Sequence, residues 1–449
     1  MRGAPPDYQE AIDYLYRFVE HTGHARWAGY EGAPRRVRAF LALLGNPETA
    51  FRSILVAGTK GKGSTAALLE AALRASGYRV GLYTSPHLHS FRERIQVQRQ
   101  LIPRGEFVRR VGVLRPLVEA WVAEHPQSDW PTTFELATVL AAAYFADQGV
   151  EVAVVEVGRG GRYDATNALP HEVALMASVS LDHVDILGDT LEAIAREKAG
   201  VVPEGGVLVS GGQALEVRRV LEEEVQRLQA VWWRAQEEAL EVRDYRHGTP
   251  PVQREEPYPV DPASVRLSLG GAFQGVNLRL ALGGVAALRA LGWRLPAATV
   301  VQGLEGATWP GRFEVVHRDP LALVDGAHNA DSAQRLVEAL AEAHPGQPVV
   351  WVVGFSSGKD VAGVLAALRA GGDVLVATRS HHPRALPTEE VAVAAREQGF
   401  LHVVETRDVE AAWEAASRLA AGEALVCFTG SLFVVAEARE LFGLAAEMD

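Results

Sequence analysis

The stretch Ile54-Leu55-Val56-Ala57-Gly58-Thr59-Lys60-Gly61-Lys62-Gly63-Ser64-Thr65 decides the fold class. Its apolar residues predict a buried strand, and the Ser-Thr pair after the glycine loop predicts the start of a helix. Loop amides and the N-terminus of that helix would face an anion, while a lysine would add positive charge. The loop departs from the standard phosphate-binding pattern, because Gly63 separates Lys62 from Ser64 and a valine occupies the first glycine position. The alternative is a flexible glycine turn with a solvated lysine.

Lysine is rare in this chain, and its few positions are informative. Of the 44 basic residues only four are lysine, and these are Lys60, Lys62, Lys198 and Lys359. Base composition of the genome explains the scarcity of lysine but not its positions. A lysine amine acts as a compact charge on phosphate, or loses its proton and reacts with a carbonyl compound; arginine does neither well. Lys198 closes a predicted helix, where a cation also favours the helix dipole, so its position alone leaves its role open.

Composition and charge narrow the class of protein. A net charge of −12 argues against broad nucleic-acid binding, which needs a basic face. No apolar run reaches the ~18 residues of a membrane-spanning helix, and the start 1–7 lacks the apolar segment of a secretory signal. The single cysteine, Cys427, excludes a disulfide framework within the chain. We therefore expect a cytoplasmic protein with no nucleic-acid or membrane partner. We also expect a monomer, although these features do not determine the oligomeric state.

The alternation of apolar strands and helices predicts an α/β fold in two domains, each with a mostly parallel sheet covered by helices. A chain of 449 residues is too long for one ordinary core. We expect a large N-terminal P-loop-type domain that binds a nucleotide over 1–308 and a smaller C-terminal Rossmann-like domain over 309–449. The irregular stretch 231–272 should hold surface strands, and Trp309-Pro310-Gly311-Arg312 looks like the linker.

Three polar residues follow predicted strands of the first domain. Ser85 lies in Thr84-Ser85-Pro86-His87-Leu88, Glu156 ends a β-branched run, and His183 lies in Ser180-Leu181-Asp182-His183. A carboxylate inside an apolar strand needs a cation or a hydrogen-bonding partner. Because the three residues stand at strand ends, where ligands of such folds collect, they are candidates for binding Mg²⁺. The alternatives are a plain turn at Ser85, an arginine partner for Glu156 and a turn cap at His183.

Two other strand-end turns are candidate ligand contacts. The glycine loop after Glu156, Gly158-Arg159-Gly160-Gly161, would allow a substrate to approach the backbone closely, although an ordinary glycine turn has the same pattern. In the second domain Asp325 follows an apolar run and could accept hydrogen bonds from a ribose or orient Arg312. The arginine could bring a planar charged fork to a phosphate.

Taken together, these motifs resemble the Mur ligase superfamily, and within it the folylpolyglutamate synthase and dihydrofolate synthase branch. The similarity runs in order from about residue 44 to 431, which is nearly the whole chain. Each motif alone is weak evidence for the family. Their shared order and spacing make a chance resemblance implausible. The motifs are GTKGKGST, TSPHL, VEVGRGGRYDATN, LDHVDILGDT, EKAG, PGRFE and DGAHNADSA.

The resemblance implies roles for particular residues. It implies that Lys198 carries a carbamate, an anion formed on its amine by CO₂ that would help to place a second Mg²⁺, and that Lys198 and His328 are catalytic. The implied ATP contacts are Gly61, Lys62, Gly63, Ser64, Asn277, Arg312 and Asp325. The implied Mg²⁺ ligands are Ser85, Glu156 and His183. The implied contacts to the pterin substrate are Thr132, Phe134, Glu135, Tyr163, Asp164 and Ala165.

The chain departs from the family pattern at several positions. Lys60 stands where asparagine is commoner, Ala330 where proline is commoner, and Arg159 and Tyr163 replace aliphatic neighbours in the glycine loop. The segment 27–32 matches poorly where a contact to pteroate is expected. These departures bear on the identity of the pterin substrate rather than on the ligase chemistry.

The activity that the resemblance implies is ATP-dependent amide formation through an acyl phosphate. The implied substrates are L-glutamate with dihydropteroate, or L-glutamate with the terminal glutamate of a reduced folate. Two alternatives remain at this point. One is a Mur-type ligase that acts on a non-folate acid, and the other is a nucleotide-binding switch or ATPase, which would leave the strand-end residues and Lys198 without a joint purpose.

Overall fold

The computed structural model describes residues 7–18, 30–182, 184–420 and 422–445. The chain forms two compact units, and the main boundary lies between Ala307 and Thr308. Two short segments, 88–90 and 268–274, cluster with the second unit although the chain around them belongs to the first. Within the described residues, no helix combines the length and apolar character needed to cross a membrane.

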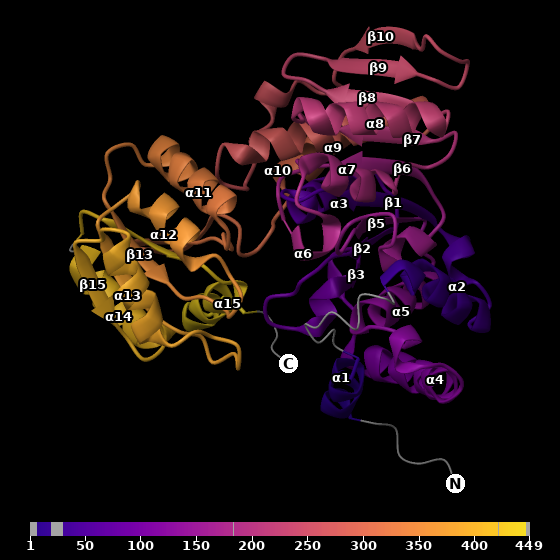
Figure 1. Ribbon diagram of the computed structural model, residues 1–449. Coiled ribbons are helices and arrows are strands. Elements are labelled where there is room, and N and C mark those ends of the chain that lie inside the picture. Colours follow the sequence, from indigo (N-terminus) through magenta and orange to yellow (C-terminus); the bar gives the residue numbers. More distant parts are fainter. Residues whose placement is uncertain (1–6, 19–29, 183, 421, 446–449) are drawn as a thin grey trace. The chain divides into compact units, whose positions relative to one another are not determined.

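The first unit contains helices on both sides of one large sheet (Figure 1). Its strands are β1 (Arg52–Ala57), β2 (Val80–Tyr83), β3 (Ile95–Val97), β4 (Gln100–Leu101), β5 (Val152–Glu156), β6 (His171–Met176), β7 (Val207–Ser210), β8 (Val231–Ala235), β9 (Leu240–Asp244) and β10 (Val252–Glu256). Its helices are α1 (Tyr8–Tyr16), α2 (Ala33–Leu43), α3 (Lys62–Ala75), α4 (Arg104–Glu124), α5 (Thr133–Asp147), α6 (Val184–Leu187), α7 (Leu191–Ala199), α8 (Leu215–Arg227), α9 (Phe273–Ala290) and α10 (Ala297–Glu305).

The order of strands in this sheet is β10-β9-β8-β7-β6-β1-β5-β2-β3-β4. The central strands β7, β6, β1, β5 and β2 run parallel, whereas β3, β4, β9 and β10 pair antiparallel at the two ends. The loops that follow β6, β1, β5 and β2 therefore leave neighbouring strands at one edge of the sheet. This edge is where α/β folds bind ligands.

Alternating residues of the central strands fill two cores. Leu55 and Ala57 of β1 pack in a cluster that also contains side chains of α1, α2, α5, α7 and α8. On the opposite face α9 lies close to β6 and α3, where a side chain at Gly284 would touch Leu175 and Leu69. Strands buried on both faces need apolar residues throughout, which explains the continuous apolar runs in the sequence.

The second unit is a smaller α/β domain whose sheet has the order β11-β12-β16-β13-β14-β15. Only β11 is antiparallel to its neighbour. The apolar residues of this sheet pack against α11, α12 and α13 on one face and against α14 and α15 on the other. The elements are β11 (Glu314–Arg318), β12 (Leu321–Val324), α11 (Ala330–Ala343), β13 (Val349–Val353), α12 (Val361–Arg369), β14 (Val374–Ala377), α13 (Thr388–Glu397), β15 (His402–Glu405), α14 (Val409–Ala420), β16 (Leu425–Thr429) and α15 (Leu432–Leu441).

The predicted fold class is confirmed, and the irregular stretch 231–272 does hold strands. Its first strand, β8, is buried rather than a surface strand, because Trp232 and Trp233 are covered. The expected linker at 309–312 leads directly into β11, which the sequence pattern did not indicate. The glycine at 311 donates its backbone N–H to the Glu314 carboxylate at 2.7 Å, so this segment is a defined turn.

We predict that Gly303→Ala destabilises the first unit. A methyl group there would overlap the carbonyl oxygen of Ala71 in α3 and lie 2.9 Å from the Cα of Ala72, so α10 would have to move away. Overpacking of this kind costs about 1–3 kcal/mol. The matched control is Gly112→Ala on the exposed face of α4, where nothing lies within 4 Å and the helix gains about 1 kcal/mol. Thermal unfolding monitored by circular dichroism measures both; an unchanged midpoint for Gly303→Ala would contradict the packing of α10 on α3.

Candidate active site

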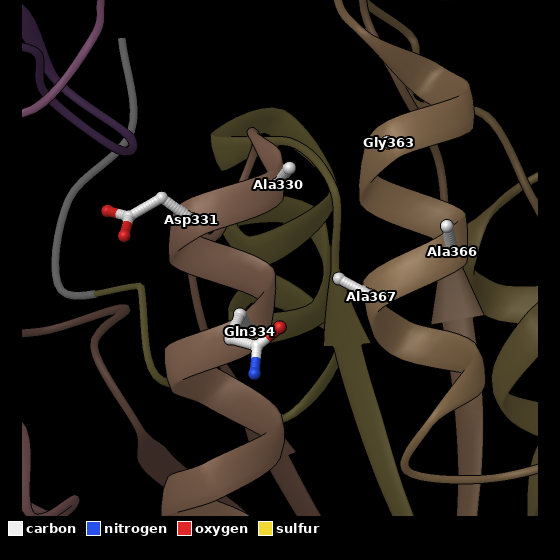
Figure 2. A pocket seen from close by; sticks show the side chains of 6 residues that line it. All are labelled: Ala330, Asp331, Gln334, Gly363, Ala366 and Ala367. Carbon is white, nitrogen blue, oxygen red and sulfur yellow. The ribbon is translucent and has the colours of Figure 1, made fainter.

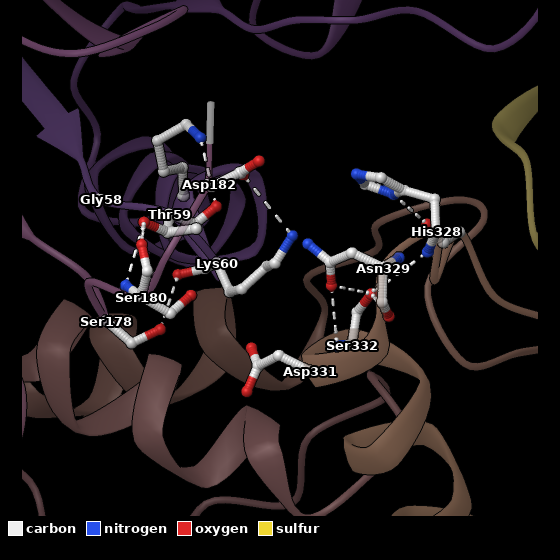
Figure 3. Close-up of polar contacts among 12 residues, drawn as sticks. Gly58, Thr59, Lys60, Ser178, Ser180, Asp182, His328, Asn329, Asp331 and Ser332 are labelled. Atoms are coloured by element: carbon white, nitrogen blue, oxygen red, sulfur yellow. Dashed lines mark hydrogen bonds and ion pairs between the residues drawn. The ribbon is translucent and has the colours of Figure 1, made fainter. Parts of the chain in front are cut away.

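The glycine loop after β1 is held by backbone contacts to the segment after β6. The Thr59 backbone N–H donates to the Ser178 carbonyl oxygen at 2.7 Å, and the Thr59 hydroxyl donates to the Ser180 carbonyl oxygen at 3.1 Å (Figure 3). Gly58 has a φ of +137°, and a side chain there would lie 2.9 Å from the Cβ of Ala177. The strand ends can therefore approach closely only because this position is glycine.

Two of the rare lysines lie in or directly after this loop and have different partners. The Lys60 amine pairs with the Asp182 carboxylate (Figure 3), and the distance between them is 3.8 Å. Lys62 begins α3, and its amine is 3.5 Å from the Thr59 carbonyl oxygen. Gly61 precedes it with a φ of +85°, and the Asn277 side chain occupies the space where a Cβ would be. The structure thus brings together Asn277 and the loop that the sequence assigns to ATP phosphates.

Two of the three predicted metal ligands lie next to each other. The Ser85 backbone N–H donates to Oε2 of Glu156 at 3.0 Å, across the neighbouring strands β2 and β5. Glu156 is 5% exposed. The third predicted ligand, His183, lies outside the described residues. Within the described part of the chain no group of three His, Cys, Asp or Glu side chains could hold a metal. A hydroxyl and a carboxylate at adjacent strand ends nevertheless form a donor set that suits Mg²⁺, which binds few protein oxygens and keeps water ligands.

Lys198 reaches the same strand ends from the last turn of α7. Its side chain is 4% exposed, and its amine donates to the Gly58 carbonyl oxygen at 2.9 Å. The pKa of the Lys198 amine is lowered to about 7, mainly by burial and also by the nearby Lys62 charge, against the opposing effect of Asp182 and other carboxylates. A substantial fraction of this amine is therefore uncharged near neutral pH, as nucleophilic attack on a carbonyl carbon requires.

The glycines of the loop 158–161 accommodate neighbouring protein groups. A side chain at Gly158 would collide with the Phe134 ring, and one at Gly161 would lie 2.6 Å from the Lys198 carbonyl oxygen. The backbone N–H of Arg159 donates to the Asp164 carboxylate at 2.8 Å. Burial raises the pKa of this carboxyl above its usual range. The small residues allow the loop to pack between Phe134 and the end of α7, a role that the sequence pattern did not distinguish from close approach to a ligand.

The other predicted pterin contacts lie near this loop and have structural partners. Thr132 caps α5 by accepting a hydrogen bond from the Glu135 backbone at 3.2 Å. Both Glu135 oxygens accept hydrogen bonds from Arg36, at 2.7 and 2.8 Å, so this carboxylate is part of a buried ion pair. Ala165 is 2% exposed, and the Tyr163 backbone N–H donates to Glu197.

In the second unit Arg312 and Asp325 lie at one turn. The Arg312 guanidinium fills the space beside Gly326 where a Cβ would be. Asp325 accepts backbone hydrogen bonds from Phe313 and Ala327, both at 2.9 Å. Burial raises the pKa of the Asp325 carboxyl, and the Arg312 charge opposes that rise. The carboxylate therefore holds the turn that carries the arginine.

His328 stands just before α11 in a fixed ring orientation. Its Nδ1 lies 2.8 Å from the Gly326 carbonyl oxygen, and its backbone N–H donates to the Ser332 hydroxyl at 3.1 Å (Figure 3). Asn329 caps α11 by accepting from the Ser332 backbone at 2.9 Å. Because Nδ1 faces a carbonyl oxygen, we assign the ring proton to Nδ1.

A cavity of about 520 Å³ in the second unit lies between α11 and α12 (Figure 2). Its lining residues are Ala330, Asp331, Gln334, Gly363, Ala366 and Ala367. None of them is a predicted site residue. The cavity is open and lined mainly by small side chains, and we assign no function to it.

The sequence pattern assigned no role to two residues near Lys198, Tyr30 and Glu197. Tyr30 lies in the poorly matching segment, and its hydroxyl is 3.0 Å from the Arg159 carbonyl oxygen and 3.3 Å from Glu197. Glu197 is part of the EKAG motif, but the motif implied a function only for Lys198. The contact joins residues far apart in the chain, and no local pattern reports such a contact.

Comparison with known proteins places the chain in a family. Residues 56–282 match the Mur ligase middle domain, and residues 311–432 match the glutamate ligase domain of Mur ligases. The chain is 36% identical to a dihydrofolate synthase/folylpolyglutamate synthase of Mycobacterium tuberculosis, over 98% of this chain and 96% of the relative. It is 32% identical to the folylpolyglutamate synthase of Lacticaseibacillus casei, over 97% and 98% of the two chains.

Solved structures agree with the sequence comparisons. The M. tuberculosis folylpolyglutamate synthase complexed with ADP superimposes with a TM-score of 0.83 at 33% identity, over 97% of this chain and 98% of that one. A bifunctional folylpolyglutamate synthase/dihydrofolate synthase from Yersinia pestis, complexed with AMPPNP and a Mn ion, gives a TM-score of 0.79 at 29% identity, over 98% of both chains.

The chain therefore belongs to the Mur ligase family, and it is a ligase that forms C–N bonds. Within that family its branch is that of the folylpolyglutamate and dihydrofolate synthases.

The position of Lys198 predicts how stability depends on pH. The folded-state pKa is about 7, against 10.5 for a free lysine, so between these values the unfolded chain binds the extra proton. Stability therefore rises with pH in this window, with a slope of up to about 1.4 kcal/mol per unit. The variant Lys198→Met lacks the amine and therefore lacks its contribution to the pH dependence of stability. Denaturant unfolding from pH 7 to 9 in CO₂-free buffer should show wild type gaining stability relative to Lys198→Met. A constant difference between them would mean that the amine is not desolvated.

Proposed function

We propose that this chain joins the amine of L-glutamate to a carboxylate of dihydropteroate, or of the terminal glutamate of a reduced folate, with ATP as the energy source. The observation that carries the proposal is the buried Lys198 amine against Gly58, beside a phosphate-type glycine loop. The names of the relatives supply the substrate class, since both the synthases for dihydrofolate and those for folylpolyglutamate match over nearly the whole chain.

The proposed reaction has two steps. A carboxylate oxygen of the pterin acid attacks the terminal phosphorus of ATP, which releases ADP and leaves an acyl phosphate. The glutamate amine then attacks the acyl carbon, and the tetrahedral intermediate loses phosphate to give the amide. Phosphoryl transfer depends on positioning and charge neutralisation, which the loop amides and Lys62 would supply. Mg²⁺ at Ser85, Glu156 and His183 would neutralise charge on the triphosphate.

We propose that Lys198 acts as a carbamate. The uncharged amine attacks CO₂ and releases a proton, so a lysine becomes a carboxylate-like anion at the same position. The lowered pKa of Lys198 supports this step, since it makes the neutral amine available at neutral pH. Arginine cannot undergo the reaction. The resulting anion would help to hold a second Mg²⁺ close to Gly58.

The second unit would contribute nucleotide and glutamate contacts. We propose that Arg312 contacts phosphate and that Asp325 fixes its turn, in line with the hydrogen bonds of that carboxylate. His328, with its ring orientation fixed by Gly326, is proposed to act near the acyl group. We also propose a cytoplasmic monomer with no nucleic-acid or membrane partner; the charge of −12 supports the absence of nucleic acid.

Glutamate-dependent ADP release tests the proposed function. Purified protein with MgATP and L-glutamate should release ADP when dihydropteroate or a reduced folate is added, and the amide product should appear in equal amount by mass spectrometry. A muramoyl nucleotide in place of the pterin acid is the control for another Mur-type activity. ATP hydrolysis that is independent of glutamate and of every acid would support a nucleotide switch and contradict the proposal.

Substitution of Lys198 tests the carbamate. Lys198→Arg should keep the fold and lose most turnover, because the guanidinium keeps its charge and cannot bind CO₂. Lys198→Ala should also lose turnover, and short carboxylates such as acetate should partly restore it by replacing the missing anion. Turnover measured by coupled ADP release decides between the outcomes, and full activity of Lys198→Arg would exclude the carbamate.

Lys62→Ala tests the phosphate role of the glycine loop. We expect kcat/KM for ATP to fall by about 10²–10³, the effect of removing one preorganised donor from a developing charge. Lys359→Ala, at an exposed loop of the second unit, is the matched control for loss of one of the four lysines. Equal effects of the two variants would contradict a specific role for Lys62.

A further inference from the structure

Glu197, the residue before Lys198, connects three separate segments of the first unit. Its Oε1 accepts a hydrogen bond from the Tyr163 backbone N–H at 3.2 Å and lies 3.3 Å from the Tyr30 hydroxyl. The same hydroxyl is 3.0 Å from the Arg159 carbonyl oxygen. The Tyr30 and Tyr163 rings meet edge to face, with their centroids 6.0 Å apart. One carboxylate thus ties the glycine loop and the segment before α2 to the end of α7.

The backbone around Glu197 is fixed from both sides. The Glu197 carbonyl oxygen accepts from the Arg162 backbone N–H at 2.8 Å. The Asn167 amide donates to the carbonyl oxygens of Arg162 and Gly200, at 3.0 and 3.1 Å. Gly160 has a φ of +66°, and a side chain there would collide with the Tyr30 hydroxyl and with the Glu197 carboxylate. The glycine loop at Gly160 therefore lies in direct contact with the Tyr30 hydroxyl and the Glu197 carboxylate.

These hydrogen bonds fix the position of the backbone that carries the Lys198 side chain. Lysine loses up to about 2 kcal/mol of rotamer freedom when it is ordered, so an anchored backbone favours one position of its amine. From this anchored turn the amine reaches the Gly58 carbonyl oxygen. The Glu197 charge by itself favours the protonated amine, which opposes reaction with CO₂. The charge of Glu197 therefore gives no reason for a carboxylate beside Lys198. The hydrogen bonds that Glu197 accepts from Tyr163 and Tyr30 do give a reason.

We propose that Tyr30 and Glu197 are positioning residues of the ligase reaction, which act by holding the turn that carries Lys198 against the glycine loop. The latch of this arrangement is the Tyr30 hydroxyl, whose single proton is shared between the Arg159 carbonyl oxygen and the Glu197 carboxylate. The inference rests on the proposed carbamate at Lys198. It also gives a role to the segment at residue 30, where the chain departs from the family pattern.

Carbon NMR with ¹³C-bicarbonate tests the latch, since a lysine carbamate gives its own carbonyl signal. Tyr30→Phe keeps the ring and removes only the hydroxyl. We expect its carbamate signal and its kcat to fall together by about tenfold, the effect of losing a hydrogen bond to a charged group. KM for ATP should stay within about twofold, since the loop at Lys62 is untouched, and higher bicarbonate should restore part of the activity by mass action.

The matched control is Tyr245→Phe, which removes a tyrosine hydroxyl that donates to Glu222 at 2.7 Å in the same unit and leaves Lys198 untouched. It should leave the carbamate signal and kcat at the wild-type level. A second pair of variants separates hydrogen bonding from charge. Glu197→Gln keeps an acceptor for Tyr30 and Tyr163, so it should retain more of the carbamate signal than Glu197→Ala, which keeps none.

The outcomes separate the latch from the proposed function. If wild type shows the carbamate signal and Tyr30→Phe matches it in signal and kcat, the latch is wrong and the carbamate stands. If wild type shows glutamate-dependent ADP release without any carbamate signal, the carbamate and the latch both fail while the ligase stands. Equal signals in Glu197→Gln and Glu197→Ala would overturn the latch even if Tyr30→Phe did not fold.

Discussion

The hydrogen bond from the Lys198 amine to the Gly58 carbonyl oxygen joins the two parts on which the first unit's site depends. Gly58 begins the glycine loop after β1, and Lys198 lies in the last turn of α7. A buried amine without a full counter-charge loses its proton easily, because burial penalises the charged form. The contact that links α7 to the loop after β1 therefore involves an amine that burial also makes easier to deprotonate.

The parallel sheet explains why unrelated short motifs meet. The strands β6, β1, β5 and β2 are neighbours and run in the same direction, so the residues after their ends share one edge. Gly58, Ser85 and Glu156 each occupy such a position, and Thr59 binds the segment after β6. Hydrogen bonds within the strands need no polar side chains. The polar residues can therefore be concentrated where the strands stop, and the apolar interior supplies the desolvation that acts on Lys198.

Much of this could be predicted from the sequence, because strand ends are local features. The apolar runs before Gly58 and Glu156 are continuous, and the residues that follow them are polar or glycine. The fold class and the family that these motifs indicated are confirmed. The roles of single residues depend on distant partners, and the sequence gives no sign of them. Both oxygens of Glu135, for example, bind Arg36, 99 residues earlier in the chain, and no local pattern indicates this partner. The contact of Tyr30 with Glu197 spans 167 positions.

The scarcity of lysine becomes interpretable at this edge of the sheet. Three of the chain's four lysines, Lys60, Lys62 and Lys198, lie at or beside the glycine loop. They differ in environment: Lys60 faces Asp182, Lys62 is partly exposed at the start of α3, and Lys198 is buried. The charge on Lys62 is one of the causes that lower the pKa of Lys198, so the partly exposed lysine helps to keep the buried one neutral. An arginine at 198 would keep its charge in the same surroundings and would need a counter-ion there. The requirement for a neutral amine thus gives a physical reason for a lysine at this position in a chain that otherwise uses arginine.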